Sequence, residues 1–172
     1  MLVVSGSPSS PVVLDRRRVE LVDQSLPRQP YHAVAEGGLP RGIIDAVADA
    51  ASGAVARELG SVARADAVGV VATERRIPPR LDQILASHTL LHAAEGQLFE
   101  SAVMDAAADA HLRVHVVEPK SIKVSAAVEA LRAVIGAPWQ KDHKWATTAA
   151  LAALASTWPE DGPGDTRRPV PE

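Results

Sequence analysis

Apolar and polar positions along the chain follow two periods, and together they predict an α/β fold. Residues 67–73 (AVGVVAT) and 112–117 (LRVHVV) are short apolar runs rich in β-branched side chains, which is typical of strands. Between them, residues 81–111 follow a helical period, and Pro78 and Pro79 separate this segment from the first run. A strand, a crossover helix and a second strand predict a βαβ unit with two parallel, neighbouring strands.

The N-terminal part of the chain predicts three more strands. Residues 2–5, 11–15 and 19–23 are short apolar or alternating runs joined by short turns, which indicates an antiparallel meander. Residues 24–40 are rich in proline and glycine. They are expected to form a loop with a brief extended piece at residues 31–35.

Three helices are expected around the βαβ unit. Residues 41–59, 121–135 and 140–157 each place apolar or small residues at helical spacing. Residues 158–172 carry four prolines and two glycines between charged residues, and we expect them to form a disordered tail. Residues 1–157 are therefore expected to form a single domain.

Composition narrows the chemistry. Aromatic residues make up only 3% of the 172 residues, so the core is expected to consist of Ala, Val, Leu and Ile. The absence of cysteine excludes disulfides and thiolate metal sites. The net charge of −3 argues against a large non-specific nucleic-acid surface. No apolar run is long enough to cross a bilayer, so we expect a cytoplasmic protein without a membrane partner.

The order of these elements resembles the ribonuclease H-like fold, and within it the Holliday-junction resolvase branch. Residues 38–75 resemble the first helix and the fourth strand of that family, the strand ending in a glutamate. Residues 141–154 (KDHKWATTAALAAL) resemble its last helix. The resemblance implies a five-stranded mixed sheet, a three-strand antiparallel meander plus parallel strands, with helices on both faces.

In that family two divalent metal ions lie between carboxylates and hydrolyse the phosphodiester bonds of nucleic acids. The resemblance implies that Glu74 and Asp142 bind Mg²⁺ or Mn²⁺, with His143 as a further candidate beside Asp142. Ser5 stands where the family has its first-strand aspartate, and a neutral hydroxyl is a weak ligand for magnesium. Two functions stay open: a metal-dependent nuclease that resembles a resolvase, and a non-catalytic binding or scaffolding protein that retains the fold.

The long predicted helix has an apolar face that also contains ionisable residues. Leu91 and Leu98 define this face, His88 and Glu95 fall in its middle, and His92 lies at its edge. Burial of an ionisable group without a partner costs several kcal/mol or forces the group to be neutral. The pattern therefore indicates that these side chains have partners or a function.

Four interpretations of His88, His92 and Glu95 stay open. They form an internal hydrogen-bonded cluster, or they line a cleft where a His–Glu pair serves general acid–base catalysis. Alternatively, the His-x3-His-x2-Glu spacing places three metal ligands on one side of the helix. In the fourth interpretation, the face pairs with its copy in a homodimer. The other histidines of the first 120 residues, His32, His111 and His115, carry no such signal.

Overall fold

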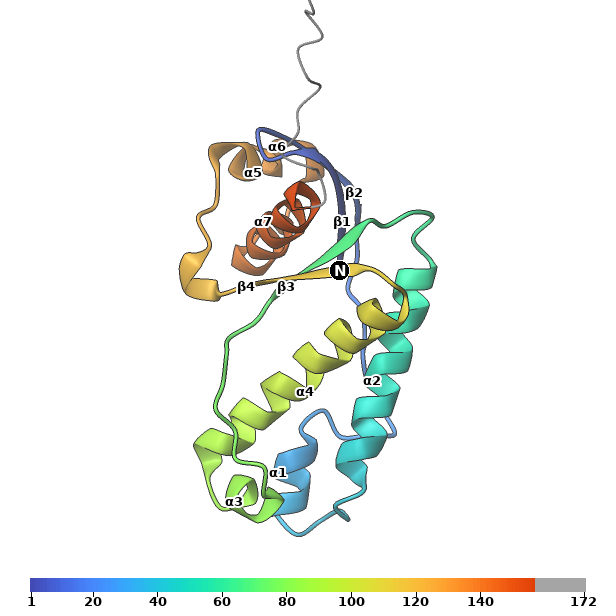
Figure 1. The fold of residues 1–172 in the computed structure, drawn as a ribbon, viewed down its shortest axis with the longest axis vertical. Helices are drawn as coiled ribbons and strands as arrows, with labels where there is room; N and C mark the ends of the chain where they lie inside the picture. The colour runs from blue at the N-terminus through green and yellow to red at the C-terminus, as the bar shows by residue number, and fades with distance from the viewer. Residues whose placement is uncertain (157–172) are drawn as a thin grey trace, which may run out of the picture.

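A computed structural model describes residues 1–156 and contains two small sheets in place of one large sheet (Figure 1). Strand β1 (Leu2–Ser7) pairs antiparallel with β2 (Ser10–Arg16), and β3 (Ala67–Val71) pairs in parallel with β4 (Arg113–Val117). Within residues 1–156 no strand joins the two sheets. The predicted five-stranded ribonuclease H-like sheet is therefore wrong.

The segment expected to be the third strand packs against a helix instead. Within residues 19–23, Val22 is buried beside Ile44 of α2 (Ile43–Gly60), and Leu21 packs on the same cluster. Alternation of apolar and polar residues specifies which side chains are buried, but it does not specify a hydrogen-bonding partner. A meander of three strands therefore shortens to a hairpin of two.

The βαβ unit is confirmed, although its helix is interrupted. Strands β3 and β4 pair in register from Ala67 with Arg113 to Val71 with Val117. The predicted helix 81–111 divides into α3 (Leu81–Leu85) and α4 (His88–Asp109). Ser87 separates them because its backbone is extended, with φ −135° and ψ 115°.

Further differences lie in the connecting segments. The expected loop 24–40 contains a short helix, α1 (Pro30–Ala35), where we expected an extended piece. The helix expected at 121–135 is replaced by three short elements, η1 (Pro119–Ser121), α5 (Ala126–Ala130) and α6 (Arg132–Ile135). Helix α7 (Lys141–Ala155) matches its prediction, and the expected tail 158–172 lies outside the described residues. No helix within residues 1–156 has the length and apolar character needed to span a bilayer.

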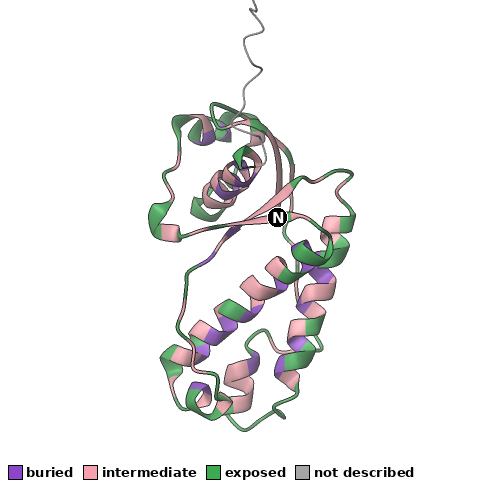
Figure 2. Ribbon diagram, in the orientation of Figure 1, coloured by how far each residue is buried: buried purple, intermediate pink, exposed green. Residues whose placement is uncertain are grey.

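Helices lie on either side of the β3–β4 pair, with α7 on one side and α4 on the other (Figure 1). On the α7 side the backbones come very close: a Cβ atom on Gly69 would lie 2.3 Å from the carbonyl carbon and oxygen of Ala149. On the other side, α2 and α4 bury their facing residues against each other, and α1 packs across both helices (Figure 2). This second group of helices carries the candidate site.

Candidate metal centre

The carboxylate of Glu95 is buried on α4, and its partner is a histidine of α1. Glu95 is only 6% exposed. Its Oε1 and Oε2 atoms lie 2.9 and 3.0 Å from Nδ1 of His32, and Oε1 also accepts the backbone N–H of His32 at 3.2 Å. An ionised carboxylate is only an acceptor, so the contact with ionised Glu95 requires the proton on Nδ1 of His32. Three contacts to one residue explain how the apolar face of α4 tolerates a carboxylate.

Helix α1 holds His32 in place because the two residues that precede it are anchored. Pro30 occupies the first turn, where its fixed φ suits a helix start and its missing N–H costs nothing, and it is buried. Tyr31 packs against the apolar residues between α2 and α4. Burial raises the pKa of the Tyr31 phenol, and the carboxylates of Asp45 and Glu95 raise it further. At neutral pH Tyr31 is therefore a protonated, apolar anchor.

The second ring nitrogen of His32 is buried and has no hydrogen-bond partner. The side chain as a whole is 15% exposed, and its Nε2 atom is shielded from solvent. With the proton on Nδ1, Nε2 presents a lone pair. A buried acceptor without a partner is uncommon in folded proteins, and a bound ion is one of its ordinary explanations.

His88 and His92 come from the first two turns of α4, and their rings lie beside the ring of His32. Both residues are exposed, and their Nε2 atoms are 3.1 Å apart. The ring centroid of His92 lies 4.6 Å from that of His32 and 4.5 Å from that of His88. One ring nitrogen from each of the three histidines lies within 4.8 Å of the others. Within residues 1–156 no other three histidine, aspartate or glutamate side chains converge so closely.

The geometry of the three rings suits a tetrahedral transition-metal ion. With Zn–N distances of about 2.0–2.1 Å, a tetrahedral ion separates two ligand nitrogens by about 3.3–3.4 Å. The Nε2 atoms of His88 and His92 already have nearly this separation, at 3.1 Å. Because these two side chains are exposed, they are free to rotate about their side-chain bonds, and an ion bound there would draw their nitrogens closer to His32. Neutral imidazole suits Zn²⁺, Cu²⁺ and Ni²⁺, whereas Mg²⁺ prefers oxygen ligands.

Glu95 contacts His32 in the way that a carboxylate contacts a metal-binding histidine at the ring nitrogen that does not bind the metal. Metal-binding histidines usually donate their second N–H to a carboxylate or carbonyl, which fixes the tautomer and the ring orientation. In this chain Glu95 contacts Nδ1 of His32, which leaves Nε2 as the ring nitrogen available to an ion, and the ring centroid of His92 lies 4.6 Å from that of His32. Of the three residues in the α4 sequence pattern, His88 and His92 belong to the converging group, whereas Glu95 contacts His32 and is not itself one of the three converging groups.

The acids predicted to bind Mg²⁺ or Mn²⁺ do not form such a group. Glu74 is exposed after β3, and its backbone N–H donates to Oε1 of Glu118 at 2.8 Å. Asp142 is exposed in the first turn of α7. His143 lies in the first turn of the same helix. Its Nδ1 accepts the backbone N–H of Gln140 at 3.1 Å, so its side chain caps the helix start. No converging triad within residues 1–156 contains any of these three residues.

Sequence reasoning missed His32 because it placed residues 24–40 in a loop. The signal was present: Pro30 is followed by six residues without glycine or proline, which suits a short helix with proline at its first position. Three nitrogen donors, two of them on exposed side chains, would leave an ion held there with a coordination position for water or another ligand. No family model, no curated protein and no solved structure matches the chain. The site is therefore described from its geometry alone.

Proposed function

We propose that this protein binds one divalent transition-metal ion through His32, His88 and His92, and that Zn²⁺ fits the centre best. One observation carries the proposal: a ring nitrogen from each of His32, His88 and His92 lies within 4.8 Å of the others, and Nε2 of His32 is buried without a hydrogen-bond partner. The Glu95–His32 contact supports it because it occupies Nδ1 and leaves Nε2 of His32 available to an ion.

With three histidine ligands, a bound ion would keep one coordination position for water or substrate. Catalytic zinc sites keep three protein ligands and leave one position for water or substrate, whereas structural zinc sites are closed by four. An ion held there would lower the pKa of its bound water or polarise a carbonyl or phosphoryl oxygen. The exposure of His88 and His92 lets such a substrate reach the ion from solvent.

The nuclease and scaffolding hypotheses stay predictions. The nuclease hypothesis depended on a five-stranded sheet that brings Glu74 and Asp142 together, and that sheet is absent from residues 1–156. Binding of Mg²⁺ or Mn²⁺ at those acids, a nucleic-acid partner and a homodimer likewise await their own tests. Zinc binding at the three histidines is independent of all of them.

Metal titration tests the proposal. Calorimetry is expected to show one Zn²⁺ ion bound per chain, and a Zn²⁺ concentration of 100 times Kd is expected to stabilise the fold by about 2.7 kcal/mol. Mg²⁺ is expected to have no effect at the histidines, since it requires oxygen ligands. Zinc affinity is expected to fall as the pH is lowered, because protonated imidazole cannot bind a metal. Absence of both heat and thermal stabilisation with Zn²⁺, Co²⁺, Ni²⁺ and Cu²⁺ would rule the proposal out.

Replacement Glu95→Gln is expected to weaken zinc binding by about 10–100-fold without removing a ligand. The neutral amide keeps the size of the side chain but no longer provides a charged acceptor for Nδ1 of His32. Glu129→Gln is the matched control, because Glu129 pairs with Lys144 and lies outside the centre. Equal zinc affinities for the two variants would show that the contact between Glu95 and His32 does not contribute to zinc binding.

A further inference from the structure

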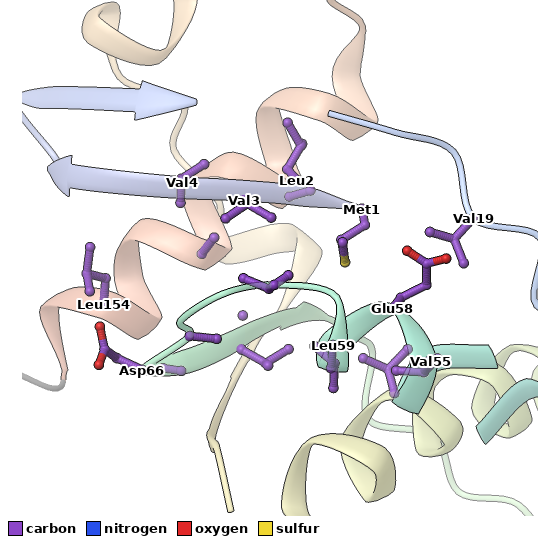
Figure 3. Close-up of a pocket in the computed structure, with 18 of the residues that line it drawn as sticks. Met1, Leu2, Val3, Val4, Val19, Val55, Glu58, Leu59, Asp66 and Leu154 are labelled. Atoms are coloured by element: carbon purple, nitrogen blue, oxygen red, sulfur yellow. The ribbon is translucent and has the colours of Figure 1, made fainter. Parts of the chain in front are cut away.

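An apolar pocket of about 390 Å³ lies between the two sheets (Figure 3). Strand β1 forms one wall with Leu2 and Val4, and the end of α2 forms another with Leu59. Strand β3 and helix α7 complete the lining, and none of the three histidines of the metal centre takes part. A volume of this size is within the range of small-molecule sites, about 300–1,000 Å³.

The pocket is lined mainly by apolar side chains that are not fully buried. Helix α7 contributes Ala146, Ala150 and Leu154, which are four residues apart and therefore share one face of the helix. Leu59 of α2 and Val103 of α4 also line the pocket, and all five residues are only partly buried. Protein interiors are normally close-packed and contain few voids larger than a water molecule. An apolar space of this volume is therefore unusual, and it has room for a ligand.

The charged groups of the lining already have partners within the protein. Glu58 pairs with Arg17 at 2.8 Å, and Asp66 pairs with Arg64 at 3.4 Å. The Met1 ammonium donates to the Arg17 carbonyl at 2.6 Å; burial and the Arg17 guanidinium lower its pKa, whereas the nearby carboxylates of Asp15 and Glu58, which offset its charge, raise it. No charged side chain of the lining is left to neutralise an ion, and burial of an unpaired ion is costly. The lining thus complements an uncharged molecule.

We propose that this pocket binds a small, uncharged, apolar molecule of about two or three rings. An engineered cavity of about 150 Å³ with an apolar lining binds one benzene. The present pocket, at about 390 Å³, has between two and three times that volume. Its apolar walls and paired rim charges recognise a hydrocarbon skeleton, and they give no anchor to a phosphate, sulfonate or carboxylate.

Two probes with the same ring skeleton test the charge and the size of the ligand. N-phenyl-1-naphthylamine is neutral, and 8-anilino-1-naphthalenesulfonate adds one sulfonate to it. The neutral probe is expected to bind saturably, at one site per chain, and the anion more than about tenfold more weakly, because its charge has no partner in the pocket. Equal affinity for the two probes, or no saturable binding of the neutral one, would overturn the proposal.

Variants that fill the pocket locate the binding site. Ala146→Leu adds three carbon atoms from α7 and Val62→Phe adds a ring from the segment after α2, so both are expected to weaken binding of the neutral probe by more than about tenfold. Ala152→Leu is the control on the same helix, since Ala152 does not line the pocket. Circular dichroism first confirms that each variant is folded. Probe affinity unchanged in a folded filling variant would place the bound molecule elsewhere and overturn the proposal.

Discussion

The His92→Ala variant is expected to bind Zn²⁺ more than about 100-fold more weakly than the natural chain and to keep its fold. Loss of an outer partner already costs about 10–100-fold in metal affinity, and His92 is a direct ligand in our proposal. The fold is expected to persist because His92 is exposed, and the buried pair of His32 and Glu95 stays intact without it. Calorimetry with Zn²⁺ and a thermal melt of the metal-free protein measure the two effects separately.

His111→Asn is the control for His92→Ala. His111 is also exposed, but it lies outside the triad, and asparagine tolerates its positive φ of 58°. This variant is expected to bind zinc as the natural chain does. A similar loss of affinity in both variants would indicate non-specific binding to surface histidines.

The Gly69→Ala variant is expected to lose about 3 kcal/mol of unfolding free energy, which lowers Tm by about 6–12 °C for a chain of this size. The new Cβ would lie 2.3 Å from two backbone atoms of Ala149 and 2.5 Å from the backbone nitrogen of Ala150. Backbone atoms cannot rotate away as a side chain does, so α7 has to move off β3. Urea titration followed by circular dichroism measures the change.

Gly53→Ala provides a matched glycine control with the opposite sign. Gly53 lies inside α2, where the nearest atom to a new Cβ belongs to the flexible side chain of Arg57, at an ordinary 3.5 Å. Alanine is favoured over glycine inside a helix, so stability is expected to rise by about 1 kcal/mol. If Gly69→Ala were as stable as Gly53→Ala, α7 would not lie against β3 as described.

Elements were predicted correctly where one local pattern determines them. The β-branched runs at β3 and β4 and the apolar stripe of α2 need only their own residues to be recognised. The break at Ser87 was missed because the apolar spacing continues from Ile84 to Leu91 across it, so the periodicity gives no sign of two helices. Sheet size was predicted wrongly because pairing between distant strands depends on packing that no short pattern encodes.

The candidate site was predicted in part for the same reason. His88, His92 and Glu95 were identified because an apolar face on one helix should not contain ionisable groups without a reason. Their partner His32 lies 63 residues before Glu95, in a segment whose prolines and glycines indicated a loop. A contact over such a separation is created by the fold, and the sequence alone offered no pattern that joins the two residues.

X-ray absorption at the zinc edge of the zinc-loaded protein tests the central claim most directly. The proposed centre predicts a four-coordinate ion with three imidazole nitrogens at about 2.0–2.1 Å and one oxygen or nitrogen from solvent. The multiple-scattering signal of imidazole is expected to fall by one ring in His92→Ala. A first shell made only of oxygen atoms, or a spectrum identical in the natural chain and in His92→Ala, would contradict the histidine centre.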